Sequence, residues 1–307
     1  MYINHNGMAT NVANTLTSHY SNLQTSTERL SSGMRINSAA DDAAGLAISE
    51  LMRADVAALN QGVRNANDAI SLIQTADGAL GVIDEKLIRM KELAEQAATG
   101  TYDSTQRLMI ESEYQQMASE ITRIANATDF NGIKLLDGTL SAQEGLAGGR
   151  IHDGSGRSSA DGLSSTGALK VHFGTLNDSA EDYYYIEIGN STASALGVGN
   201  AAGPNQAGRT ISTQQAAQEA LVAINNAIVS KDKIRAHLGA MQNRLENTVT
   251  NLTVQSENLQ AAESRIRDVD VATEMTNFVR NQVLTQSAVA MLSQANSMPQ
   301  MALQLIG

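Results

Sequence analysis

The chain has 307 residues and a formal net charge of -11, and 42% of its residues are apolar but only 3% are aromatic. The acidic balance argues against nucleic acid as a partner, because nucleic-acid binding requires a basic face. The absence of cysteine excludes disulfides, thiolate metal sites and cysteine catalysis. No apolar run approaches the roughly 18 residues of a membrane helix, so we expect no membrane insertion.

Both ends of the chain lack ionised side chains. The first Asp, Glu, Lys or Arg is Glu28 and the last is Arg280. An unpaired buried charge costs several kcal/mol, so long charge-free arms are suited to burial. The two matched arms therefore predict packing against copies of the same molecule. The apolar residues expected to pack there are Leu16, Leu23, Val283, Leu284, Val289, Leu292, Met298, Met301 and Leu305.

A long helix is predicted after the first arm. Apolar residues recur every seven positions from residue 59 onward, with a second row three residues further along, which is typical of a coiled-coil seam. Ser38 is the expected N-cap, with Asp41 and Asp42 in the first turn, and Gly100 is the expected stop. The seam of this helix includes Leu59, Ile73, Leu80 and Leu87.

A second, shorter helix is predicted over residues 104–127. Its apolar residues follow the spacing of one helix face. The residues expected to point inward are Leu108, Ile110, Tyr114, Met117, Ile121 and Ile124.

The middle of the chain, residues 137–208, is rich in Gly, Ser, Asn and Asp, as is typical of turns and loops. Two β-prone runs, 169–173 and 183–188, predict a β-hairpin or small sheet with a long loop. Residues 141–166 are almost without apolar side chains and predict an exposed, mobile loop.

A second long seamed helix is predicted over about 211–268, and Lys231 is the one polar break in its seven-residue row. Two such helices at opposite ends of the sequence are natural partners, with 104–127 as a third. The alternative at this point is an ordinary helical bundle. The seam of the second long helix includes Leu238, Leu245, Leu252 and Leu259.

The fold class that follows is mainly α: an antiparallel coiled-coil hairpin rod with a small β-hairpin region and paired terminal helices. The chain is divided into an N-terminal arm, the first half of the rod, a variable β and loop region, the second half of the rod and a C-terminal arm. Their predicted bounds are 1–40, 41–140, 141–210, 211–268 and 269–307.

No catalytic, cofactor-binding or metal-binding residues are predicted. The five histidines are scattered without metal-ligand spacing, and the glycine-rich run at 197–203 follows no convincing strand. Asp268 and Asp270 lack the Gly turn and the twelfth-position Glu of a calcium loop. Asp41 and Asp42 are interpreted as helix-start residues, because no base or metal partner is evident. We therefore do not expect an enzyme.

Several blocks of the sequence strongly resemble bacterial flagellins. The blocks LSSGMRINSAADDAAGLAIS (30–49), RNANDAISLIQTADGAL (64–80) and FNGIKLLDG (130–138) are similar to the N-terminal half of that family. RIRDVDVATEM (265–275) and LSQANSMPQMALQLI (292–306) are similar to the C-terminal half. The resemblance covers about 1–140 and 210–307 and leaves out the variable middle.

The resemblance implies a structural subunit that polymerises into the flagellar filament for swimming motility. In such filaments the paired termini form the inner tube, the rods form the next layer, and the arms are disordered in the free subunit. The arm 281–307 is expected to have no internal partner, and repeated contacts that do not close give an open helical filament.

The resemblance also implies export without signal cleavage, growth beneath a cap protein and a chaperone that masks the C-terminal arm. The predicted location is outside the cell in the flagellar filament, although a filament enclosed in a periplasm stays open. The first sixteen residues lack the basic and apolar segments of a secretory signal, which agrees with this route. The other partners are copies of the chain, a cap protein and hook-filament junction proteins.

A second role is implied for the rod surface. In flagellins detected by Toll-like receptor 5, the receptor binds a patch that matches 87–100 and 110–117 here, with Arg89, Leu93 and Glu113 at the contact positions. Arg89 and Leu93 are four residues apart and are expected on one helix face. Ile88 stands where the best-detected flagellins carry an amide. The alternative use of the patch is subunit packing.

Two other function classes are kept beside the filament subunit. A hook-filament junction adaptor has similar arms but does not self-propagate. A secreted coiled-coil tip protein would have a binding role. Elongation of sheared filament fragments by the purified chain distinguishes these possibilities, since only a filament subunit extends the fragments.

Overall fold

The computed structural model describes residues 6–141, 151–152, 167–176, 178, 182–202 and 207–306; for 151–152 and 302–306 it describes only the backbone. Most of the predicted loop at 141–166 lies outside these residues. The chain forms two compact units, one from 1–57 with 256–307 and the other from 58–255. The division falls inside the two long helices.

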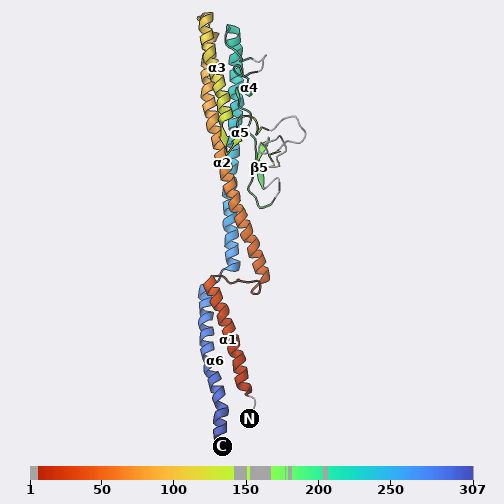
Figure 1. Ribbon diagram of the computed structural model, residues 1–307, viewed down its shortest axis with the longest axis vertical. Helices are drawn as coiled ribbons and strands as arrows, with labels where there is room; N and C mark the ends of the chain where they lie inside the picture. Colours follow the sequence, from red (N-terminus) through yellow and green to blue (C-terminus); the bar gives the residue numbers. More distant parts are fainter. Residues whose placement is uncertain are drawn as a thin grey trace. The chain divides into compact units, whose positions relative to one another are not determined.

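The described part of the chain is mainly helical, which confirms the predicted fold class (Figure 1). Its helices are α1 (Gly7–Ser32), α2 (Ala43–Ala98), α3 (Ser104–Ala127), α4 (Ala193–Leu196), α5 (Gln214–Arg267) and α6 (Val271–Ile306). Its strands are β1 (Asp129–Phe130), β2 (Ile133–Lys134), β3 (Ile151–His152), β4 (Ala168–His172) and β5 (Tyr183–Ile186). None of the described helices has a stretch apolar enough to cross a membrane.

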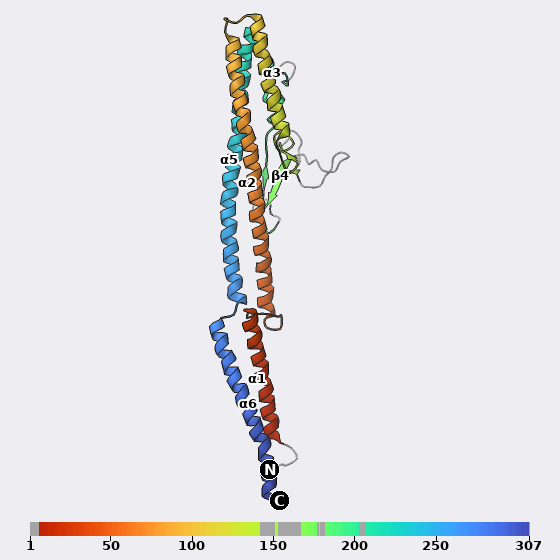
Figure 2. The same ribbon diagram turned by 60° about the vertical axis from the view of Figure 1, so that its left-hand side comes forward.

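In the unit formed by 58–255, α2, α3 and α5 lie side by side (Figures 1 and 2). The seven-residue rows of α2 and α5 face a shared apolar core. Along α2, every row residue from Ala66 to Ala97 is at most 4% exposed. The predicted seam residues in the core are Leu59, Ile73, Leu80, Leu87, Leu238, Leu245 and Leu252, all buried. Leu259 of α5, which belongs to the other unit, is half-buried.

Helix α3 has the predicted bounds, and its start is fixed by the Gln106 side chain, which accepts a hydrogen bond from the Asp103 N–H at 3.1 Å. Tyr114 and Ile121 are buried in the core. The predicted inward position of Leu108 is wrong, since this residue is 59% exposed. Leu108 lies near the start of α3, on the side of the helix that faces solvent.

The predicted cap at Ser38 would start the helix at residue 39, but α2 begins four residues later, at Ala43. The Asp42 carboxylate accepts a hydrogen bond from the Gly45 N–H at 2.9 Å, so Asp42 and not Ser38 caps the helix. The Ser38 N–H and hydroxyl instead donate to Asp41 within a tight turn. These bonds lower the pKa of Asp41, the Ser38 N–H first and the Asn37 N–H second.

The predicted hairpin is present as β4 and β5, which pair antiparallel, and β3 pairs parallel to β4. The sheet lies close against α2. The Asn65 side chain donates to the His172 carbonyl at 2.8 Å. Gly62 leaves room for the Phe173 carbonyl, which a Cβ at this position would meet at 2.0 Å. A side chain of any size at Gly62 would therefore separate the sheet from the helix.

The segment that leads into α5 is held by polar side chains of α3. The Tyr114 hydroxyl donates to the Gly208 carbonyl at 2.7 Å, and burial raises the pKa of Tyr114. The Gln115 amide donates to the Arg209 carbonyl at 2.7 Å, and the Glu111 carboxylate accepts from the Ile211 N–H. These bonds satisfy backbone groups that lie over the end of the apolar core.

Candidate assembly surfaces

In the unit formed by 1–57 and 256–307, α1 and α6 pack against each other along their length. The predicted lack of an internal partner for 281–307 is therefore wrong, because α1 supplies one. The buried side chains of α6 are small or polar, and their spacing places them on one face of the helix. They are Glu274, Thr285, Ala288 and Ala295.

The bulky aliphatic residues of α6 point away from this seam. Each of the following eight is at least 38% exposed: Val271, Met275, Val279, Val283, Leu284, Val289, Met291 and Met301. On α1, Met8 and Tyr20 are more than half exposed. Scattered exposed apolar residues are ordinary, but a helix apolar on every side indicates burial on every side. Here one partner helix covers a single face, so the remaining faces call for further partners.

The predicted arm residues divide between these faces. Leu16, Leu23, Leu292 and Met298 are half-buried at or beside the α1–α6 contact. Val283, Leu284, Val289 and Met301 are exposed. The side chain of Leu305 lies outside the described residues.

The two terminal helices are tied together at the end that holds Pro299. Proline has no N–H, so Pro299 leaves the Ala295 carbonyl without its usual helical donor. The Asn6 side-chain amide donates to this carbonyl at 2.9 Å. The Asn6 side-chain oxygen also accepts from the Ala9 N–H, as an N-cap does. One side chain therefore starts α1 and satisfies the backbone group that the proline leaves free.

At the other end of the pair, the segment after α1 and the segment before α6 form a short antiparallel β-bridge between Met34 and Asp268. The Arg35 N–H donates to the Arg267 carbonyl at 2.6 Å, and the Val269 N–H donates to the Gly33 carbonyl at 3.0 Å. The largely buried guanidinium of Arg267 pairs with Glu50 at 2.9 Å. These contacts hold this end of the helix pair together.

The rod surface carries the predicted receptor residues on α2 and α3. Arg89 donates to the Glu113 carboxylate at 2.7 and 3.0 Å and to Glu92 at 2.9 Å, and all three are exposed. The Glu113 bond is the main cause that raises the pKa of Arg89. Leu93 does not share this surface, since it is 1% exposed within the core of α2, α3 and α5. The expected common face of Arg89 and Leu93 is therefore wrong.

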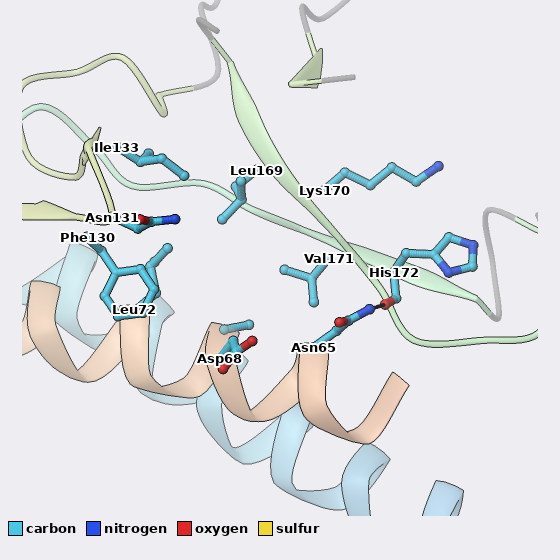
Figure 3. Close-up of a pocket in the computed structure, with 11 residues that line it drawn as sticks. Asn65, Asp68, Leu72, Phe130, Asn131, Ile133, Leu169, Lys170, Val171 and His172 are labelled. Atoms are coloured by element: carbon cyan, nitrogen blue, oxygen red, sulfur yellow. Dashed lines mark hydrogen bonds between the residues drawn. The ribbon is translucent and has the colours of Figure 1, made fainter. Parts of the chain in front are cut away.

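A shallow cavity of about 350 Å³ lies where α2, the β1–β2 turn and β4 meet (Figure 3). Leu72, Phe130 and Val171 are among its apolar walls, and Asn65 and Asp68 stand on its helical side. Its polar lining residues include Asn65, Asp68 and His172, and the Asn65 side chain already donates to the His172 carbonyl. Among the described residues, no group of three or more acidic or histidine side chains is arranged to hold a metal ion.

Comparisons with known proteins agree with this arrangement. The family model for the bacterial flagellin N-terminal helical region matches residues 3–141, and that for the C-terminal helical region matches 221–306. A flagellin of Bacillus subtilis (strain 168) is 43% identical over 310 residues, with all of both chains covered. The chain belongs to the bacterial flagellin family. It is a structural subunit of the flagellar filament, and it associates with copies of itself.

Other relatives extend this result. Flagellin FlaB2 of Treponema pallidum (strain Nichols) is 40% identical over 306 residues, with all of both chains covered. A putative flagellar hook-associated protein of Vibrio parahaemolyticus has a solved structure similar to that of this flagellin, with a TM-score of 0.52, 16% identity, and coverage of 74% of this chain and 100% of the other. At that identity the similarity concerns the fold alone.

Proposed function

We propose that the exposed faces of α1 and α6 are the contacts through which copies of this flagellin pack into the inner tube of the filament. The observation that supports this is the distribution of side chains on α6. Small and polar residues such as Thr285 and Ala288 meet α1, whereas bulky residues such as Val283 and Val289 face solvent. A helix selected only to pair with α1 would have the reverse distribution.

Burial of the outward faces supplies the driving force for subunit addition. Each aliphatic side chain that becomes fully buried contributes roughly 1.5–3 kcal/mol, offset by the ordering of the arm. The arms 1–27 and 281–307 contain no ionised side chain, so their burial leaves no charge without a partner. Growth is then favoured where ordered arms of earlier subunits already stand.

The pairing of α1 and α6 is weak by itself. The fully buried residues of this two-helix contact are small or polar, its leucines are only half-buried, and isolated helices of this kind are marginal in water. We therefore propose that the arms are loosely held in the free subunit and become fixed when neighbouring copies cover them. The division into inner-tube arms (1–40 and 269–307), rod halves and a variable region is part of the same proposal.

The exposed arms also account for the other proposed partners. We propose that a chaperone masks the C-terminal arm before export, and that cap and hook-filament junction proteins contact the same faces at the two ends of the filament. The proposed location is the filament outside the cell. The role is mechanical, without a catalytic step or a cofactor.

Truncation tests this function. Variants that lack 1–27 or 281–307 are mixed with sheared filament fragments of the parent protein, and elongation is followed by electron microscopy. Both variants are expected to stay helical in circular dichroism and to add no length, whereas the full chain extends the fragments. Long filaments from either truncation would contradict the proposal. Failure of the full chain to elongate fragments would favour a junction adaptor.

We also propose that the rod surface around Arg89 and Glu113 is recognised by Toll-like receptor 5 when the flagellin is free. The supporting observation is that these two side chains are exposed and already paired. Receptor binding would therefore cost little side-chain entropy at this pair. Leu93 supports this surface from within the core. An Arg89→Asp variant is expected to lose most activation of receptor-bearing cells.

The matched control for that test is Arg123→Asp, because Arg123 forms an exposed ion pair with Glu120 elsewhere on α3. This control is expected to activate cells as the parent protein does. Equal activation by Arg89→Asp and the parent would contradict receptor binding at this surface without affecting the proposal for the filament.

A further inference from the structure

We infer that a cluster of ion pairs within the rod specifies how α2 and α5 align. The centre of the cluster is Lys231, the one polar residue in the apolar row of α5. Its side chain is 2% exposed, and its ammonium group lies 2.6 Å from Asp84 of α2 and 2.7 Å from the neighbouring Asp232. One turn further along α5, the Arg235 guanidinium binds Asp77 at 2.7 and 3.2 Å.

The charges that pair across the two helices are separated by helix, whereas Asp232 pairs with Lys231 within α5. Both acids on α2, Asp77 and Asp84, are one heptad apart, and both bases on α5, Lys231 and Arg235, are one turn apart. The side chains therefore meet only when α2 pairs with α5. Pairing of α2 with a second α2 would bring carboxylates together, and pairing of α5 with a second α5 would bury two ammonium groups.

Apolar contacts alone do not fix the register of this pair. The seam residues repeat every seven positions, so a slide of one heptad again sets Leu and Ile residues against one another. A slide in either direction separates both ion pairs and allows only one exchanged pair, Arg235 with Asp84 or Lys231 with Asp77. A slide one way places Lys231 opposite Lys91, seven residues beyond Asp84. The opposite slide places Arg235 opposite the apolar Ile70.

A buried ion pair adds little stability, because removal of both ions from water offsets their attraction. We therefore attribute the burial of Lys231 to its role in specifying the alignment of α2 and α5, and not to a gain in the free energy of folding. The hydrogen bonds from Glu111 and Tyr114 to residues 208–211 hold the loop before α5. They act on α3 and this loop, whereas the ion pairs act directly between the two long helices.

The test uses the full chain and the fact that it has no cysteine, so two introduced cysteines are the only attachment sites for spin labels. Asn67→Cys on α2 and Asn226→Cys on α5 are both at exposed positions in the unit formed by 58–255. In the observed alignment residue 226 faces about residue 89, so the labels are about 33 Å apart along the helices at 1.5 Å per residue. A slide of one heptad changes this separation by about 10 Å.

The labelled parent is compared with an uncharged variant, Lys231→Leu/Asp84→Leu/Arg235→Gln/Asp77→Asn, by electron–electron resonance and by thermal unfolding. The parent is expected to give one narrow distance. The uncharged variant is expected to keep or raise the melting temperature and to add a second population shifted by about 10 Å. Lys231→Arg, which retains the cation, is expected to keep the single distance.

Three results would overturn the inference. A single unchanged distance in the uncharged variant would show that the apolar rows are sufficient. A melting temperature lowered by more than about 10 °C with an unchanged distance would assign the ion pairs to stability. A second population in Lys231→Arg would show that side-chain shape, and not charge, determines the alignment.

Discussion

The unit formed by 58–255 and the terminal helices α1 and α6 bury different kinds of side chain. The first unit encloses an extended core of leucine, isoleucine and methionine between α2, α3 and α5, although Met109 and Val222 on its surface are exposed. Helix α6 turns alanine, threonine and glutamate toward α1 and leaves valine, leucine and methionine in solvent. The difference teaches that one region has a large apolar core of its own, whereas the other depends on burial by copies of the chain if our proposal for the inner tube holds.

The largest expected effect is on polymerisation. Val283→Asp places a carboxylate on the outward face of α6, where Val283 is 54% exposed. Burial of this charge between subunits is strongly unfavourable, so we expect filament elongation to be abolished. The helical content of the monomer should not change, because the residue faces solvent there. Sedimentation of filaments and circular dichroism of the monomer measure the two effects.

A matched change at Asp55, an exposed and already charged position on α2, is the control. Asp55→Asn should leave the monomer unchanged and have a much smaller effect on sedimentation. Filaments of normal length from Val283→Asp would mean that this face of α6 is not buried on assembly.

The next effect distinguishes the two regions by stability. Leu80 is fully buried, and Leu80→Ala should lower the free energy of unfolding by about 2–5 kcal/mol. Leu284 is 38% exposed, and Leu284→Ala should cost less than about 1 kcal/mol in the monomer. Denaturant unfolding of the monomeric proteins measures both. Equal losses would show that the monomer buries α6 as deeply as the rod.

A smaller effect concerns the contact between the sheet and α2. Gly62→Ala would place a Cβ 2.0 Å from the Phe173 carbonyl, so the sheet must move and we expect a loss of roughly 1–3 kcal/mol. At Gly78 of the same helix, a Cβ would meet no other atom within 4 Å, and Gly78→Ala should stabilise the helix by up to about 1 kcal/mol. Hydrogen exchange of β4 and the melting temperature are measured for both variants. If Gly62→Ala raised the melting temperature as Gly78→Ala does, a close contact between Gly62 and Phe173 would be contradicted.

The smallest effect is a pH dependence at the start of α6. The Asp270 carboxylate accepts from the Thr273 hydroxyl at 2.6 Å and from the N–H groups of Thr273 and Ala272, and these bonds lower the pKa of Asp270. A lowered folded-state pKa means that the stabilisation is present above the unfolded-state value of about 3.9 and is lost as pH falls through the folded-state value. The difference in melting temperature between the parent and Asp270→Ala should therefore shrink below about pH 4. A constant difference from pH 7 to pH 2 would contradict this role.

Much of the rod can be predicted from the sequence because its core obeys one rule. The seven-residue rows put apolar residues on one side of α2 and α5, and the bounds of α3 follow from its capping residues and its apolar spacing. The polar break at Lys231 is visible in the sequence as an exception to the row. Its partner on the other helix is not, since the pairing of Asp84 with Lys231 depends on the register of two distant segments.

The remaining errors arise where local patterns compete. Ser38 and Asp42 are both good cap residues, and only the turn closed by Asp41 decides between them. Spacing alone also cannot say how far a face extends. Leu108 follows the apolar spacing of α3 but lies beyond the edge of its buried face, and Leu93 is one turn from Arg89 yet faces the core. The pairing of the terminal helices is predicted from the sequence, but its fully buried residues are not, because Thr285, Ala288 and Ala295 are small or polar and follow no apolar row.

Methionine oxidation tests the central claim most directly, because exposed Met275, Met291 and Met301 lie on the outward faces of α6 and Met90 is fully buried in the rod. Monomer and assembled filament are treated with the same dose of hydrogen peroxide, and sulfoxide at each residue is measured by mass spectrometry. We expect the three α6 residues to oxidise readily in the monomer and to be strongly protected in the filament, with Met90 protected in both. Equal oxidation of the three in monomer and filament would contradict the claim that copies of the chain cover these faces.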